Sequence, residues 1–109
     1  MTDQYVLVLS TLPSPNPAPS RLARTLVEER LAACVSILPA MTSVYRWKDG
    51  IEQESEHQVV MKTTRERVPA LWARLRELHP YDVPEFIVIP IVDGNEVYLQ
   101  WIAESTAGH

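Results

Sequence analysis

Four side chains that can bind metals or exchange protons lie close together in the segment 79–85: His79, Tyr81, Asp82 and Glu85. An imidazole nitrogen combined with carboxylate oxygens is a ligand set that Zn, Cu and Ni accept. The segment also fits a turn that ends a helix, because the helix dipole favours a histidine in the last turn and Pro80 stops the helix. The turn is the simpler interpretation, but His79, Asp82 and Glu85 are the first candidates for metal ligands.

Cys34 is the only cysteine and therefore the only thiolate ligand in the sequence. A thiolate suits Cu(I) or Zn(II), and a symmetric oligomer could bring several copies together around one ion. Lone cysteines, however, are mostly buried and act as small apolar side chains, so core packing is the simpler role. One cysteine cannot form an internal disulfide, which fits a reducing compartment, and we expect a cytoplasmic protein.

Three glutamates, Glu52, Glu54 and Glu56, alternate along the chain. In a strand, alternate residues share one face at a spacing of about 6.7 Å, which is too far for one ion to bind all three easily. A solvated acidic face that protects the strand from aggregation is the simpler interpretation. The alternative is a weak divalent-cation site completed by a neighbouring subunit.

Composition and spacing exclude several other kinds of chemistry. Only three glycines occur, so a glycine-rich phosphate loop is impossible, and no catalytic triad or zinc-ligand spacing is recognisable. We therefore expect no catalytic residues and no organic cofactor. A net charge of −4 and a pI near 5.3 argue against nucleic-acid binding. The apolar run 5–12 is too short to cross a membrane.

The elements that must position these side chains alternate between strands and helices. Apolar β-formers predict strands at 5–10, 34–38, 42–47, 51–63 and 85–89, with Pro39 interrupting the second and third. Helical apolar stripes run through 21–32 and 68–78. Thr63 and Glu66 could form a capping box for the second helix, although Pro69 would then lie too deep inside it. Asn95 fits the N-cap of a short final helix.

The order βαββαβ plus a C-terminal helix predicts one ferredoxin-like α+β domain over residues 1–109, with two helices on one face of an antiparallel sheet. Its central hairpin turns at Lys48-Asp49-Gly50, where Asp-Gly accepts positive φ angles. Each arm of roughly 13–15 residues spans about 45–50 Å, whereas a domain of this length is only about 35 Å across.

A hairpin of this length predicts an oligomer, because isolated two-stranded ribbons are marginal in water. Tyr45, Trp47 and Ile51 near the tip are the expected interface residues, and Trp101 of the final helix is a further candidate. The alternative is a hairpin bent at Pro39 and folded back over its own sheet.

Several motifs together resemble one known family. They are Leu31-Ala32-Ala33-Cys34-Val35, then Ser43, Tyr45 and Trp47, then Lys62-Thr63, His79-Pro80-Tyr81, Pro84-Glu85, and Tyr98-Leu99 with Trp101. In order and spacing this pattern is similar to the divalent-cation tolerance (CutA) family from about Val6 to Ile102. The chain departs from the family pattern at Ser36, at Asp82 and in the position of Gly50 within the hairpin turn.

The resemblance implies a cytoplasmic homotrimer of ferredoxin-like subunits, similar in architecture to PII signalling proteins. It also implies a non-catalytic role in tolerance of divalent metals, with binding of copper or another divalent ion. The alternative is a PII-like regulatory module that binds a small anionic metabolite or a partner protein in clefts between subunits. In neither case do we expect a nucleic-acid or membrane partner.

Overall fold

The computed structural model describes residues 4–14 and 18–108, and its elements follow the order expected from the sequence. They are β1 (Tyr5–Pro13), α1 (Ala18–Glu28), β2 (Cys34–Ile37), β3 (Met41–Trp47), β4 (Gly50–Thr64), a 3₁₀ turn (Arg65–Arg67), α2 (Val68–Leu78), β5 (Ile87–Pro90) and α3 (Glu96–Ser105). The prediction of a ferredoxin-like α+β fold with an added C-terminal helix is confirmed.

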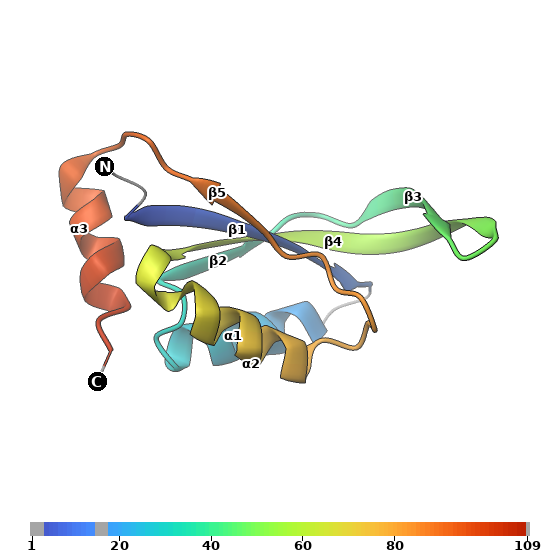
Figure 1. Ribbon diagram of the computed structural model, residues 1–109, viewed down its shortest axis with the longest axis horizontal. Helices are drawn as coiled ribbons and strands as arrows, with labels where there is room; N and C mark the ends of the chain where they lie inside the picture. The colour runs from blue at the N-terminus through green and yellow to red at the C-terminus, as the bar shows by residue number, and fades with distance from the viewer. Residues whose placement is uncertain (1–3, 15–17, 109) are drawn as a thin grey trace.

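The sheet has the strand order β2-β4-β1-β5, and β3 pairs with the outer part of β4. All of these pairings are antiparallel. Helices α1 and α2 lie together on one face of the sheet, while α3 crosses the end opposite the hairpin (Figure 1). The long strand β4 is the central element of the sheet, because it pairs with three other strands.

The core lies between this sheet and the two helices. Alternate residues of β1 and β4 point toward the helices, and the buried cluster includes Val6, Val8, Leu12, Val59, Met61, Leu26, Leu71 and Leu75. Residues of the opposite parity face the uncovered side. On β5, Ile87 and Ile89 remain 48% and 38% exposed there. The uncovered face is thus apolar at one edge, and this edge is a candidate contact surface for another subunit.

Helix α2 begins later than a capping box at Thr63 would place it. The Thr63 hydroxyl instead donates a hydrogen bond of 2.8 Å to the carbonyl of Leu31, so the capping-box prediction is wrong. A 3₁₀ turn over Arg65–Arg67 intervenes, and Pro69 lies in the first helical turn. A proline is tolerated there because the first N–H groups of a helix have no intrahelical acceptor.

The β3–β4 hairpin projects past the helices (Figure 1), and the longest dimension of the molecule is 44 Å against 26 and 24 Å for the others. Pro39 lies in the break between β2 and β3. Val44 and Ile51 on the projecting part are 63% and 61% exposed. The alternative of a hairpin folded back over its own sheet is therefore wrong for this chain.

The hairpin turn differs in one detail from the prediction. Trp47 pairs with Gly50, which leaves Lys48 and Asp49 as the turn residues. The positive φ angle, 56°, belongs to Lys48, and no glycine has a positive φ among the residues described. The expectation that the Asp-Gly pair supplies this conformation is wrong, because the turn lies one residue earlier.

Candidate functional site

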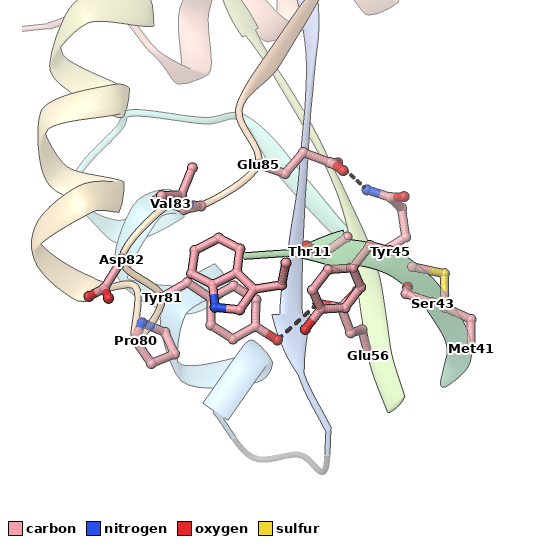
Figure 2. A pocket seen from close by; sticks show the side chains of 13 residues that line it. Thr11, Met41, Ser43, Tyr45, Glu56, Pro80, Tyr81, Asp82, Val83 and Glu85 are labelled. Atoms are coloured by element: carbon pink, nitrogen blue, oxygen red, sulfur yellow. Dashed lines mark hydrogen bonds between the residues drawn. The ribbon is translucent and has the colours of Figure 1, made fainter. Parts of the chain in front are cut away.

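A cavity lies between the hairpin and the loop that follows α2 (Figure 2). It encloses about 720 Å³, within the range of small-molecule sites. Four regions line it: the end of β1, the whole of β3, the middle of β4 and the loop 80–85. The hairpin and this loop are far apart in sequence, so the cavity exists only in the folded chain.

One wall of the cavity comes from the period-two geometry of β3. Met41, Ser43, Tyr45 and Trp47 are alternate residues, so they share one face of the strand and all line the cavity. The register sets Met41 opposite Glu56 and Tyr45 opposite Glu52. The aromatic residues of one arm therefore lie on the same face as the carboxylates of the other.

Glu56 is the most deeply placed acidic group of the cavity, with 6% of its surface exposed. The hydroxyl of Tyr81 donates a hydrogen bond of 2.8 Å to Glu56 Oε2 (Figure 2). Burial, this hydrogen bond and the negative charge of Glu56 all raise the pKa of Tyr81, so the phenol stays protonated. Desolvation together with Glu54, Glu52 and Glu56 likewise raises the pKa of Tyr45.

Glu85 is held by Gln58. The Gln58 side-chain amide donates to Glu85 Oε2 at 2.9 Å and to the backbone carbonyl of Ser10 at 2.7 Å. This leaves Glu85 Oε1 without a hydrogen-bond donor in the described part of the chain. Asp82 lies exposed at the rim, and its carboxylate points away from Glu56 and Glu85 (Figure 2). The cavity thus contains two oriented carboxylates and a third at its edge.

His79 lies behind the cavity wall, 7% exposed, and uses both ring nitrogens. Nε2 lies 2.6 Å from the carbonyl of Thr11, and Nδ1 accepts from the backbone N–H of Tyr81 at 3.1 Å. A ring that donates at Nε2 and accepts at Nδ1 is the neutral tautomer. Burial lowers the pKa of His79, against the opposing effects of the Thr11 carbonyl and Glu56. His79 therefore anchors the loop to β1.

Cys34 lies in a different place from the other candidate ligands. It pairs with Lys62 in the register of β2 and β4, and its thiol lies 3.7 Å from the hydroxyl of Ser36 on the uncovered face of the sheet. The core-packing role expected for Cys34 is only partly met, because the residue is partly exposed. Among the residues described, no three His, Cys, Asp or Glu side chains form a group that could hold a metal ion.

Glu56 lies in a different environment from the one that its sequence pattern predicts. Its alternation with Glu52 and Glu54 indicated a solvated acidic strand face, which fits the two exposed residues and is wrong for Glu56. The residue that covers it, Tyr81, is 25 positions away along the chain. Spacing along the chain gives no signal for a pair so far apart in sequence.

The four expected interface residues are all accessible. Tyr45 and Trp47 are 39% and 40% exposed and line the cavity. Ile51 lies at the hairpin tip, and Trp101 lies on α3, 42% exposed, with its ring 5.3 Å from that of Tyr98. These residues occupy two separate regions, the hairpin and α3.

Comparisons with a protein-family model, with related sequences and with solved structures agree on one family. The family model described as "CutA1 divalent ion tolerance protein" matches residues 6–105. The chain belongs to the CutA1 family. The divalent-cation tolerance protein CutA of Thermus thermophilus is 47% identical over 100 residues, which cover 92% of this chain and 96% of that protein. The resemblance noted in the motifs is confirmed.

Solved CutA structures agree with this membership. The crystal structure of CutA from Xylella fastidiosa superposes with a TM-score of 0.90 at 42% identity, covering 94% of this chain and 98% of that one. Human protein CutA is 48% identical over 85 residues, and the matched region is 78% of this chain but 48% of the human protein. In the described residues, no helix of this CutA1 chain is long and apolar enough to cross a membrane.

Proposed function

We propose that this CutA1 protein is a non-catalytic homotrimer of the cytoplasm that binds copper or another divalent metal ion. The observation that supports cation binding is the charge of the cavity: among the described residues, it is lined by Glu56, Asp82 and Glu85 and by no Lys or Arg. Negative charge held in a partly desolvated hollow attracts cations. The lone Cys34 is consistent with a reducing compartment.

The metal ligands are completed between subunits in this proposal. Within the described ranges, Asp82 and Glu85 each have a carboxylate oxygen without a hydrogen-bond donor at or near the rim, where a neighbouring chain could add metal ligands. Cys34 lies on the uncovered sheet face, where a three-fold axis would gather three thiolates suited to Cu(I). His79 joins such a site only if the loop releases one of its two hydrogen bonds.

Calorimetric titration of metal-free protein with Cu(II) and Zn(II) tests this proposal. We expect saturable binding that weakens in Asp82→Asn or Glu85→Gln if the carboxylates are ligands, and in Cys34→Ser if the thiolate is. Glu104→Gln changes an exposed carboxylate on α3 and should leave the titration unchanged. Absence of binding by the wild-type protein would remove the metal-binding half of the proposal.

A second candidate function is a regulatory module that binds a small molecule in the cavity. The observation that favours it is the lining of Tyr45, Trp47 and Tyr81 around about 720 Å³, which is far larger than one metal ion requires. Aromatic walls with a few oriented polar groups are typical of organic-ligand sites. Thermal-shift screening of metabolites, with a Trp47→Ala variant as control, checks this candidate.

A further inference from the structure

The charge and shape of the cavity indicate what chemical class of ligand it takes. We infer that it binds a small organic cation, such as a quaternary ammonium or an alkylamine, with the positive charge against Trp47 and Tyr45 and directed toward Glu56 and Glu85. This inference rests on the small-molecule function proposed above and specifies its ligand. The charge is opposite to that of the anionic metabolite expected from PII-like architecture.

The first support is an unbalanced charge. Glu56 is 6% exposed, and its single hydrogen-bond donor in the described part of the chain is the neutral hydroxyl of Tyr81. Glu85 has a neutral donor as well, the amide of Gln58. Desolvating a carboxylate is costly unless a positive charge compensates it. Both groups therefore favour a cationic ligand over a neutral or anionic one.

The second support is the aromatic lining. Three rings, those of Tyr45, Trp47 and Tyr81, line the same hollow as these carboxylates. The faces of such rings attract organic cations, and indole does so most strongly. A tyrosine phenol is uncharged at neutral pH, and the raised pKa values of Tyr45 and Tyr81 keep both rings uncharged at higher pH as well, so they act as rings and hydrogen-bond donors rather than as counter-ions.

The chain itself shows that the Trp47 ring accepts a cation. The ammonium of Lys48 lies 6.0 Å from the centroid of the Trp47 ring, within the usual range of a cation–π contact. Lys48 is not among the described residues that line the cavity. A bound cation would be repelled by Lys48, and removing that charge should strengthen binding.

An inner-sphere metal site does not account for the same features. Glu56 and Glu85 are tied to different partners, and the described residues contain no group of three metal-ligating side chains. Aromatic rings add nothing to the first coordination shell of a hard divalent ion, whereas they form much of the contact surface of an organic cation. The cavity therefore fits the organic cation better.

Choline and its uncharged carbon analogue 3,3-dimethylbutan-1-ol test the inference, because they have the same shape and differ in charge. The readouts are calorimetry and the NMR signal of the Trp47 indole N–H in the intact, native oligomer. We expect choline to bind at least about ten-fold more tightly than 3,3-dimethylbutan-1-ol. The same difference should separate n-butylamine from n-butanol. Equal affinity for charged and neutral partners would overturn the inference while leaving a small-molecule role standing.

Variants locate the binding. Glu56→Gln keeps an acceptor for Tyr81 but removes the charge, and should weaken choline binding about ten-fold or more. If that variant does not fold, Glu85→Gln supplies the same test at a less buried position. Lys48→Asn should strengthen binding because it removes the positive charge beside Trp47. Asparagine is chosen because it tolerates the positive φ angle at this position. Glu104→Gln on α3 should change nothing.

The remaining outcomes also decide between the proposals. Binding of Cu(II) or Zn(II) without binding of either ammonium compound would overturn the inference and leave the metal proposal intact. Binding of choline that shifts only the signals of Trp72 or Trp101, or that is unchanged in both Glu56→Gln and Glu85→Gln, would also overturn it. Binding of neither metal nor ammonium compound would remove both.

Discussion

At the scale of single residues, His79 links the loop after α2 to strand β1 of the sheet. Its ring connects Thr11 of β1 to the backbone of Tyr81, and Tyr81 in turn reaches Glu56. The position of the cavity wall therefore depends on one neutral imidazole. Protonation at Nδ1 would remove the acceptor for the Tyr81 N–H and add a charge in a buried place.

We predict that His79 makes the free energy of unfolding depend on pH below neutrality. Burial lowers the pKa of His79 from its ordinary value of 6.5, so the unfolded chain binds the proton more readily than the folded one. Stability from this residue is present above pH 6.5 and is lost as the pH falls toward the folded-state pKa. Urea unfolding at a series of pH values from about 7.5 to about 5 measures this.

The matched control for that prediction is His79→Gln, which keeps a donor and an acceptor but does not titrate. His57 and the carboxylates contribute the same background to both proteins, so the difference between the two curves isolates His79. The wild-type curve should fall more steeply than that of the variant as the pH drops. Parallel curves would show that His79 keeps its ordinary pKa.

Residues such as His79 and Glu56 show where sequence analysis reaches its limit. The polar character of the segment 79–85 and its place at a helix end are local information, which the sequence contains. The Thr11 carbonyl, however, is 68 positions from His79, and Tyr81 is 25 from Glu56. Which polar groups satisfy one another across such separations depends on packing, so the sequence predicts a polar segment here but not the hydrogen bonds that it makes.

At the scale of elements, the sequence signals are local, so the predicted helices and strands lie close to the observed ones. Apolar runs of β-formers predict the strands and helical apolar stripes predict α1 and α2, and Asn95 caps α3 as expected, accepting from the N–H groups of Val97 and Tyr98. The errors lie at element ends. At α2, the helix-breaking property of Pro69 outweighs the capping-box pattern, and at the hairpin the turn excludes Gly50.

The end of α1 carries a strained residue whose replacement should stabilise the protein. Arg30 has a φ of 61°. Its N–H donates to Val27 and that of Leu31 donates to Leu26, both at 3.0 Å, which is the Schellman pattern with Arg30 at the position that glycine prefers. We predict that Arg30→Gly raises the free energy of unfolding by roughly 1 kcal/mol, because glycine adopts this φ angle without strain. The variant also loses the exposed hydrogen bond from the Arg30 guanidinium to the Ser105 carbonyl, which reduces the gain slightly.

The same substitution within α1 should have the opposite sign. Arg24 lies inside the helix and is exposed, so Arg24→Gly should lower the free energy of unfolding by about 1 kcal/mol. Urea denaturation of both variants beside the wild-type protein gives the comparison. If both substitutions destabilise equally, the left-handed conformation at Arg30 carries no strain.

At the scale of the whole molecule, the apolar surface left uncovered by one chain points to assembly. The hairpin extends beyond its own core with Val44 and Ile51 exposed, and the sheet face opposite α1 and α2 leaves Ile87 and Ile89 accessible. Exposed apolar side chains on the projecting hairpin and on the open sheet face are the kind of surface that neighbouring subunits bury. The cavity adjoins the same hairpin, since Tyr45 and Trp47 of β3 line it.

We predict that the protein in solution has three times the chain mass of 12.4 kDa, and that Ile51→Glu lowers this mass. Ile51 is 61% exposed in the single chain, so the substitution leaves the subunit core intact and penalises only burial by a neighbour. Val92→Glu, at a position 92% exposed in the loop before α3, is the matched control and should stay trimeric. Light scattering coupled to gel filtration measures all three proteins. A monomeric wild type would refute the assembly, whereas a trimeric Ile51→Glu variant would show that the hairpin tip lies outside the interface.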